Sequence, residues 1–400
     1  MMNSEPYRKA PFYRAAVCLA LMGIGLTVVA GRTTAERAKV VSVPLIQRGV
    51  HLFVQVTIDD KPALFALDTG AGVNLVTPKA ARRLDLTPEK GQISVLGAGG
   101  KSDAAPAVKF GTLGVGEAVV KAQSAYIISL PGALACDGLL GTPFFRAWVV
   151  QIDYAQLRLT LIPHSSFLPP ADASALPIRF YNNIPALEAT VDGLKGRFTV
   201  DTGAGDAVTL FGPFVAQNHL HDRYSPALQT VTGRGIGGLI YGDLVRLPTF
   251  AIGPFPFTRV AAQLSRQTEG AFAGKETAGN LGGEILQRFT LTLDYADNKI
   301  FLARNGRYDT PFIVNRSGLA LDYEQGTTLV RVVIPNSPAS EAGVQEGDAV
   351  IGIDGTPIDR ITSWDMHEIF RGEPGKKIDL RLRGLDKTER EVTLILRDLL

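Results

Sequence analysis

The chain has 400 residues, of which 46% are hydrophobic and 20% are charged, and its formal net charge is +2. This length predicts two to four domains with ample core, and the composition is that of a globular protein. The balance of 41 basic and 39 acidic residues, with no arginine-rich tail, argues against nucleic acid as a partner. The 42 glycines and 24 prolines favour strands and turns over helices.

Residues 1–38 are predicted to be a signal peptide or a signal anchor. Arg8, Lys9 and Arg14 precede an uncharged, largely apolar run over residues 15–31, and Ala30 supplies a small residue before a cleavage site. The run is at the lower limit of transmembrane length, which favours a cleaved signal and leaves an uncleaved anchor as the alternative. Either form predicts export from the cytosol, with membrane contact only through an uncleaved segment.

A first unit is expected over residues 39–163. An alternating strand, a turn and a second strand lead into the pentapeptide from Asp68 to Gly72. Near the end of the unit, Leu139-Leu140-Gly141 precedes a strand that closes on Asp153-Tyr154. A glycine-rich hairpin containing Gly97, Gly99 and Gly100 is either a mobile flap or a set of tight turns.

The second unit, over residues 178–305, repeats this pattern after a proline-rich linker over 164–177. The pentapeptide from Asp201 to Gly205 begins 133 residues after Asp68, and Asn280-Leu281-Gly282 precedes a strand that closes on Asp294-Tyr295. Gly235, Gly237 and Gly238 form the matching glycine-rich hairpin. Two similar units on one chain predict a pseudo-two-fold pair of lobes.

The C-terminal region, residues 312–400, differs from both units. An apolar strand begins near Gly318, a helix is predicted from Ser363, and residues 380–396 alternate as two strands.

The twin pentapeptides carry the chemistry. Two carboxylates that are brought face to face cannot both ionise cheaply, so they share a proton. One then acts as an acid and the other as a base towards a water molecule, without a metal or cofactor. The alternative is a pair of strand turns with no chemical role. His219 and His221 have no third ligand at suitable spacing and are interpreted as surface residues, while Asp153 and Asp294 are expected to fix turns.

The paired Asp-Thr-Gly-Ala motifs, the two Leu-Gly signals and the Asp-Tyr strands resemble the retropepsin-like aspartic proteases over about residues 43–303. Residues 312–400 resemble a PDZ domain of the bacterial type. The arrangement resembles bacterial exported aspartic proteases with a C-terminal PDZ domain. This resemblance implies a mainly β fold, with two retropepsin-like closed β lobes followed by an α+β PDZ domain, located in the periplasm or cell envelope.

The resemblance also implies site roles. Asp68 and Asp201 form the catalytic dyad. Their supports are Thr69, Gly70, Thr202 and Gly203. The flaps contain Gly97, Gly99, Gly100, Gly235, Gly237 and Gly238. The PDZ loop, which receives a C-terminal or extended peptide, contains Gly318, Leu319, Ala320 and Leu321.

The predicted function is that of an aspartic endopeptidase acting on peptide or protein substrates, with a PDZ domain that recruits or regulates them. A non-catalytic envelope scaffold that keeps a peptide-binding cleft is the alternative. Asn280, in place of a hydrophobic residue, and the extra carboxylate of Asp206 depart from the family pattern. They leave the catalytic competence of the second lobe open.

Overall fold

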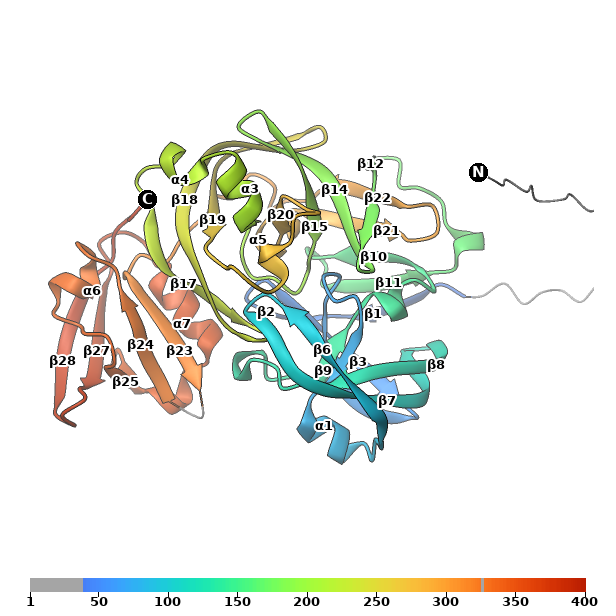
Figure 1. Ribbon diagram of the computed structural model, residues 1–400, viewed down its shortest axis with the longest axis horizontal. Helices are drawn as coiled ribbons and strands as arrows, with labels where there is room; N and C mark the ends of the chain where they lie inside the picture. Colours follow the sequence, from blue (N-terminus) through green and yellow to red (C-terminus); the bar gives the residue numbers. More distant parts are fainter. Residues whose placement is uncertain (1–38, 325–326) are drawn as a thin grey trace, which may run out of the picture. The chain divides into compact units, whose positions relative to one another are not determined.

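The computed structural model describes residues 39–324 and 327–400. The predicted signal segment, residues 1–38, lies outside the described residues. The described chain is mainly β, as predicted, with two matching eight-stranded sheets followed by a smaller α+β region (Figure 1). None of the helices in the described part combines the length and apolarity needed to span a bilayer.

The first lobe is built on one eight-stranded sheet. Its strands, in spatial order, are β2 (Ile46–Arg48), β3 (His51–Ile58), β4 (Lys61–Leu67), β9 (Gly138–Leu140), β5 (Asn74–Val76), β8 (Ala118–Ile127), β7 (Gly100–Val115) and β6 (Pro88–Gly97). A second pairing of β3 with β7 places Ile58 opposite Leu113 and folds the sheet back on itself. The helical segments are α1 (Pro78–Arg83), η1 (Gly132–Leu134) and α2 (Thr142–Phe145).

The second lobe repeats this order strand for strand. Its sheet contains β13 (Arg179–Tyr181), β14 (Ile184–Val191), β15 (Leu194–Val200), β20 (Gly279–Leu281), β16 (Val208–Leu210), β19 (Phe255–Ser265), β18 (Gly238–Ile252) and β17 (Leu228–Gly235). The pairing of β14 with β18 corresponds to that of β3 with β7. The helical segments are α3 (Gly212–Gln217), α4 (Leu220–Arg223), η3 (Ala271–Ala273) and α5 (Gly283–Leu286).

A six-stranded sheet joins the lobes. Its strands are β1 (Val41–Pro44), β11 (Arg158–Ile162), β10 (Val149–Asp153), β21 (Phe289–Asp294), β22 (Lys299–Arg304) and β12 (Ser174–Pro177). Antiparallel pairing of β10 with β21 crosses the lobe boundary. Residues 164–177, which were predicted to be a linker, contain regular structure. They begin with the short helix η2 (His164–Ser166) and end with strand β12, which pairs with β22.

Asp153 and Asp294 fix the turns after β10 and β21, as expected. Asp153 accepts hydrogen bonds from the N–H groups of Ala155 and Gln156, and Asp294 accepts them from Ala296 and Asp297. His219 and His221 are exposed to solvent at least in part, as expected, and His221 lies 2.8 Å from Asp243.

Apolar side chains cover both faces of the first lobe's sheet. On β3, Leu52 and Val54 belong to the large core that runs through both lobes, while Phe53 belongs to a separate cluster on the opposite face. This second cluster also contains Ala66 and Leu139, which flank the first pentapeptide. The alternation of side chains along the strand thus supplies the core and, on the other face, an apolar floor beside Asp68.

The C-terminal region has its own sheet and core. The sheet order is β23 (Leu319–Glu324), β24 (Thr327–Val333), β25 (Ala349–Ile353), β27 (Lys377–Arg383) and β28 (Glu389–Ile395), and β26 (Thr356–Pro357) pairs with β25. The helical segments are α6 (Pro338–Glu341), η4 (Ile358–Arg360) and α7 (Ser363–Phe370). Helix α7 begins at the predicted residue because Thr362 and Asp365 form a capping box.

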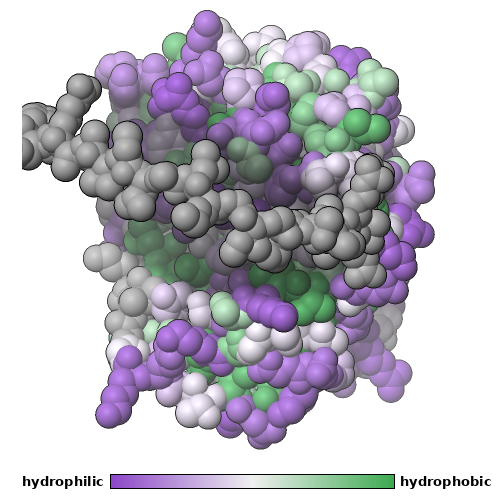
Figure 2. All heavy atoms as spheres, turned by 90° about the vertical axis from the view of Figure 1, so that its right-hand side faces the viewer, coloured by the Kyte–Doolittle hydropathy of each residue, from purple (hydrophilic) through white to green (hydrophobic). Residues whose placement is uncertain are grey.

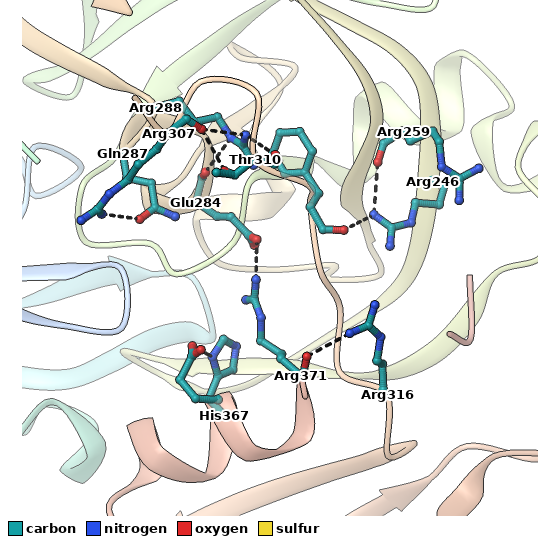
Figure 3. A network of polar contacts seen from close by, with 12 residues as sticks. Arg246, Arg259, Glu284, Gln287, Arg288, Arg307, Thr310, Arg316, His367 and Arg371 are labelled. Atoms are coloured by element: carbon teal, nitrogen blue, oxygen red, sulfur yellow. Dashed lines mark hydrogen bonds and ion pairs between the residues drawn. The ribbon is translucent and has the colours of Figure 1, made fainter. Parts of the chain in front are cut away.

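The start of this region differs from the predicted boundary at residue 312. Phe312 and Val314 are buried in the core of the lobes, whereas the separate C-terminal core begins with Leu319. Hydrogen bonds from three arginines also fix the connecting segment. Two of these arginines donate to carbonyl oxygens of the segment, and the third, Arg316, lies on the segment and donates to Arg371. Arg288 donates to Tyr308 and Thr310, Arg246 donates to Phe312, and Arg316 donates to Arg371 (Figure 3).

On the face of the molecule shown in Figure 2, hydrophilic residues predominate and apolar residues form smaller groups between them. Leu168 and Leu385, each 84% exposed, are the most exposed large apolar side chains among the described residues.

Candidate active site

Strands β4 and β15 deliver Asp68 and Asp201 to equivalent positions. Each aspartate directly follows its strand, and its N–H bonds to the last residue of the neighbouring parallel strand. Asp68 donates to Leu140 at 3.1 Å, and Asp201 donates to Leu281 at 2.9 Å. The backbone of each turn is therefore fixed by the sheet before any side chain contributes.

Thr69 and Thr202 connect the two turns across the lobe boundary. Each hydroxyl accepts a hydrogen bond from the other threonine's N–H at 3.1 Å. Each also donates to the opposite strand, Thr69 to Val200 at 2.7 Å and Thr202 to Leu67 at 2.9 Å. Both side chains are fully buried. This reciprocal set of four bonds holds the two pentapeptides against each other.

Gly70 and Gly203 make room for the carboxyl group of the other lobe. A Cβ on Gly70 would lie 2.3 Å from Cγ of Asp201, and one on Gly203 would lie 2.5 Å from Cγ of Asp68. Any side chain at either position would overlap the opposite carboxyl group. The structure therefore brings Asp68 and Asp201 together, each beside the glycine of the other turn.

The two carboxyl groups have perturbed pKa values. Burial, the charge of Asp201 and a hydrogen bond between the two side chains raise the pKa of Asp68 well above its usual value. Burial also raises the pKa of Asp201. Hydrogen bonds from Asn280, Gly203, Asp68 and Ala204 oppose this rise. One proton shared between the two carboxyl groups is the state that this environment favours.

Asn280 is the residue that sequence reasoning treated only as a departure. Its Nδ2 donates to Oδ2 of Asp201 at 3.0 Å, and its Oδ1 accepts from Thr199 Oγ1 at 2.5 Å. Comparing the two units position by position would have revealed the pair, because the matching residues in the first lobe, Ala66 and Leu139, are apolar.

The side chain of Asp206 makes its hydrogen bonds outside the dyad. Its Oδ2 accepts hydrogen bonds from Thr209 and Gln263, and burial raises its pKa to about 6. Among the described residues, no group of three or more His, Cys, Asp or Glu side chains could hold a metal ion.

The two glycine-rich hairpins meet at their tips. The N–H of Gly99 donates to the carbonyl of Ile236 at 3.0 Å. A Cβ on Gly97 would lie 2.4 Å from the Ile236 oxygen, and one on Gly237 would lie 2.6 Å from Gly100. The glycines predicted from the sequence at 97, 99, 100, 235, 237 and 238 are therefore all at this tip-to-tip contact or next to it.

Each hairpin also places an apolar side chain against the other lobe. Ile236 packs on the first lobe's cluster of Phe53, Ala66 and Leu139, and Ala98 packs on the second lobe's cluster of Phe211, Ile240 and Phe272. Since Ala66 and Leu139 flank the turn of Asp68, the hairpins close over the region that contains the dyad.

The C-terminal region places Gly318, Leu319, Ala320 and Leu321 at the start of β23. Gly318 has φ +82°, and a Cβ there would lie 2.1 Å from Ser337 Oγ. Strand β23 pairs only with β24 in the described sheet, and it also lies against strand β17 and η1.

This region also contacts both lobes. Arg234, on flap strand β17, makes two hydrogen bonds to Asp322 on β23, at 3.0 and 2.8 Å. Arg371, at the end of α7, bonds to the buried Glu284 on α5 at 2.8 Å (Figure 3). The ring of Trp364 lies 4.9 Å from that of His51, whose Nε2 is 3.0 Å from the Gly203 oxygen. Sequence reasoning missed all three contacts.

Comparisons with known proteins agree with this division of the chain. Residues 54–144 and 187–285 match an aspartyl protease family, and residues 329–384 match a PDZ domain family. A 100-residue segment is 28% identical to the chloroplastic C-terminal processing peptidase of Tetradesmus obliquus and covers 22% of each chain. The chain thus spans about a fifth of that relative's length.

A solved structure of an aspartic proteinase from Irpex lacteus is also similar. It is 13% identical, with a TM-score of 0.45, over 68% of this chain and all of the other. The two lobes of the chain belong to the retropepsin-like aspartyl protease family, and they are followed by a PDZ domain.

Proposed function

We propose that this protein is an aspartic endopeptidase that hydrolyses peptide bonds with a water molecule activated between Asp68 and Asp201. The observation that carries the proposal is the mutual approach of the two carboxyl groups, each over the glycine of the opposite turn. The threonine bonds fix that geometry, and the burial of both groups favours a single shared proton.

The reaction requires one charged and one protonated carboxyl group. The charged carboxylate takes a proton from water while the oxygen attacks the peptide carbonyl, and the other carboxyl group gives its proton to the carbonyl oxygen. Breakdown of the tetrahedral intermediate returns a proton to the leaving nitrogen. The closed hairpins would shield this exchange from bulk water once a substrate lies beneath them.

Cleavage of an unfolded protein substrate tests the proposal. Asp68→Asn and Asp201→Asn should each lower the rate by about 10²–10⁴-fold, because each removes one partner of the proton exchange. Asp153→Asn is the matched control, since its Oδ1 only accepts turn hydrogen bonds that asparagine can also accept. Near-normal turnover of either dyad variant would remove that residue from the mechanism. A wild-type chain that binds peptides without cleaving them would be the non-catalytic scaffold.

The PDZ domain is proposed to regulate the protease lobes as well as to recruit substrates. Its peptide-binding strand β23 neighbours flap strand β17, and Arg234 connects the two. A peptide added along β23 would change the surroundings of Asp322 and therefore the hold on the flap. A PDZ-binding peptide should then alter the hydrolysis of a separate substrate that is too short to reach both sites, whereas recruitment alone would leave that rate unchanged.

Residues 1–38 are proposed to direct export to the periplasm or cell envelope. The support is the basic start, the apolar run and Ala30 in the sequence. A fusion of residues 1–45 to a reporter that is active only outside the cytosol should be active. An intact but silent fusion would contradict export.

A further inference from the structure

We propose that Asn280 and Thr199 are positioning residues that place the negative charge of the dyad on Asp201 and leave the proton on Asp68. The activity readout of this inference rests on the proposed peptidase function. The charge assignment itself can be measured without catalysis.

The geometry begins with strand register. Thr199 on β15 lies directly opposite Asn280 on the parallel strand β20. Thr199 is two residues before Asp201 in the sequence. Thr199 Oγ1 donates to Oδ1 of Asn280, and this bond orients the amide so that Nδ2 faces Asp201. Asn280 is only 2% exposed, so its amide has little access to water as an alternative partner.

The first lobe has apolar side chains at the two matching positions. At the same register, Ala66 lies opposite Leu139, and neither side chain can donate a hydrogen bond. Oδ1 of Asp68 is buried and accepts no hydrogen bond from the rest of the described chain.

Asp201, in contrast, accepts several hydrogen bonds. It accepts from Asn280 at 3.0 Å, from the Gly203 N–H at 2.9 Å and from the Ala204 N–H at 3.1 Å. A carboxylate that accepts several N–H bonds is stabilised in its charged form. Backbone N–H groups of the matching turn also lower the pKa of Asp68, so the amide of Asn280 is the donor that distinguishes the two lobes.

Other titratable groups near Asp201 do not offset this difference at mildly acidic pH. Burial lowers the pKa of His51 to about 4, so this ring is neutral above that pH. Burial raises the pKa of Asp206 to about 6, so its negative charge, which opposes that of Asp201, is largely absent below that pH. Burial raises the pKa of Tyr154 above its usual value, so its hydroxyl remains neutral. Asp68 also faces Asp201, and its proton completes the pair.

This assignment gives the two aspartates distinct roles. Asp201 takes a proton from water as the new oxygen–carbon bond forms, and Asp68 transfers its proton to the carbonyl oxygen. When the carbon–nitrogen bond breaks, the proton on Asp201 moves to the leaving amine and Asp68 recovers its own. One water is consumed for each peptide bond broken, and the dyad returns to its starting state.

The pH profile of kcat/KM tests the roles of Asn280 and Thr199. Asn280→Leu and Thr199→Ala give the second lobe the residues of the first. Loss of the amide donor should move the acid limb of the profile upward by about one pH unit, equivalent to a tenfold change in the ionisation constant. The alkaline limb should stay in place, because Asp201 is charged on both sides of that step. Thr199→Ala should move the acid limb in the same direction by less.

Thr292→Val is the matched control. Thr292 is buried to 1% exposure and accepts a hydrogen bond from Gln151 within the shared sheet, away from the dyad. Its replacement should move neither limb. If Asn280→Leu does not fold, Thr199→Ala carries the test. An unchanged acid limb in a folded variant, or an equal movement of both limbs, would overturn the inference.

Titration of the ¹³C-labelled aspartate carboxyl carbons separates this inference from the proposed function. The two dyad signals are assigned by their loss in Asp68→Asn and Asp201→Asn. In the wild type, Asp201 should ionise at a lower pH than Asp68. The gap between their two measured pKa values should narrow in Asn280→Leu. A gap that narrows in a chain without peptidase activity would support the charge assignment and refute the function. Cleavage by a chain whose gap does not narrow would refute the charge assignment alone.

Discussion

The two lobes share a strand order and a dyad turn, but they differ in polar partners. In the first lobe, apolar Ala66 and Leu139 flank Asp68 and Leu96 occupies the strand before the flap tip. In the second lobe, the corresponding positions hold Thr199 and Asn280 beside Asp201 and Arg234 next to the PDZ domain. The duplicated sheet supplies a symmetric geometry. A few polar side chains in one copy then make the charge distribution and the contacts of the lobes unequal.

The largest expected effect tests where the lobes are equivalent. Gly70→Ala and Gly203→Ala should each lower kcat/KM by about 10²-fold or more, because the added Cβ would overlap the opposite carboxyl group. Both should also lower the unfolding temperature. Gly132→Ala is the control, since a Cβ there meets no atom within 4 Å. An active Gly203→Ala with an inactive Gly70→Ala would show that the turns are not equivalent.

A second prediction uses pH and stability to separate the lobes. The pKa of Asp68 is raised in the folded chain, so this residue does not destabilise the fold below the usual carboxyl pKa. Above that pKa, the folded protein becomes less stable as pH rises, because the buried side chain resists ionisation. Asp68→Asn should therefore raise the unfolding temperature by a few °C at pH 7 and little at pH 3.

Asp201→Asn should give a smaller gain, because Asn280 and two N–H groups already stabilise the charge that it removes. Thermal unfolding of both variants at the two pH values measures the difference. Equal gains would mean that the dyad is electrostatically symmetric.

A third prediction concerns the contact between strand β17 of the second lobe and strand β23 of the PDZ domain. Arg234→Leu introduces the residue type found at the matching position of the first lobe, Leu96. It removes two hydrogen bonds that Asp322, which is 2% exposed, accepts. Burial opposes the ionisation of Asp322, but the bonds from Arg234 and Arg331 hold its pKa below the usual value. The loss should weaken the docking of β17 on β23 by about 1–3 kcal/mol.

Hydrogen exchange in β17 and β23 measures that docking. Exchange should increase in both strands of Arg234→Leu, while short-peptide hydrolysis should fall less than in Gly203→Ala. Arg331→Leu is the comparison within the PDZ domain, since Arg331 bonds to the same carboxylate at 2.9 Å. Faster exchange in β23 alone after Arg234→Leu would argue against coupling to the flap.

The smallest effect concerns the turns that close the shared sheet. Asp153→Ala and Asp294→Ala each remove two hydrogen bonds to backbone N–H groups, and each should lower the free energy of unfolding by about 0.5–1.5 kcal/mol. Asp294 is only 5% exposed, so its loss should cost more. Denaturant unfolding of the two variants measures the difference, and a larger cost at Asp153 would contradict it.

The sequence determined the parts of this protein that depend on local pattern and on repetition. Alternating apolar residues that lead into Asp68 and Asp201 specify strands followed by tight turns. Because the whole unit occurs twice, it also specifies two similar lobes. Glycines at 97, 99, 100, 235, 237 and 238 mark the hairpin tips. The capping box of Thr362 and Asp365 specifies the start of α7.

Only the tertiary structure decided which distant groups meet. Asn280 is 79 residues from Asp201 along the chain, and Arg234 is 88 residues from Asp322, so no local periodicity links either pair. The same reason explains why Phe312 belongs to the core of the lobes rather than to the PDZ domain, and why Ser174–Pro177 forms an edge strand rather than a linker. Hydrogen bonds and burial depend on strand register and domain docking, which arise only when the whole chain packs.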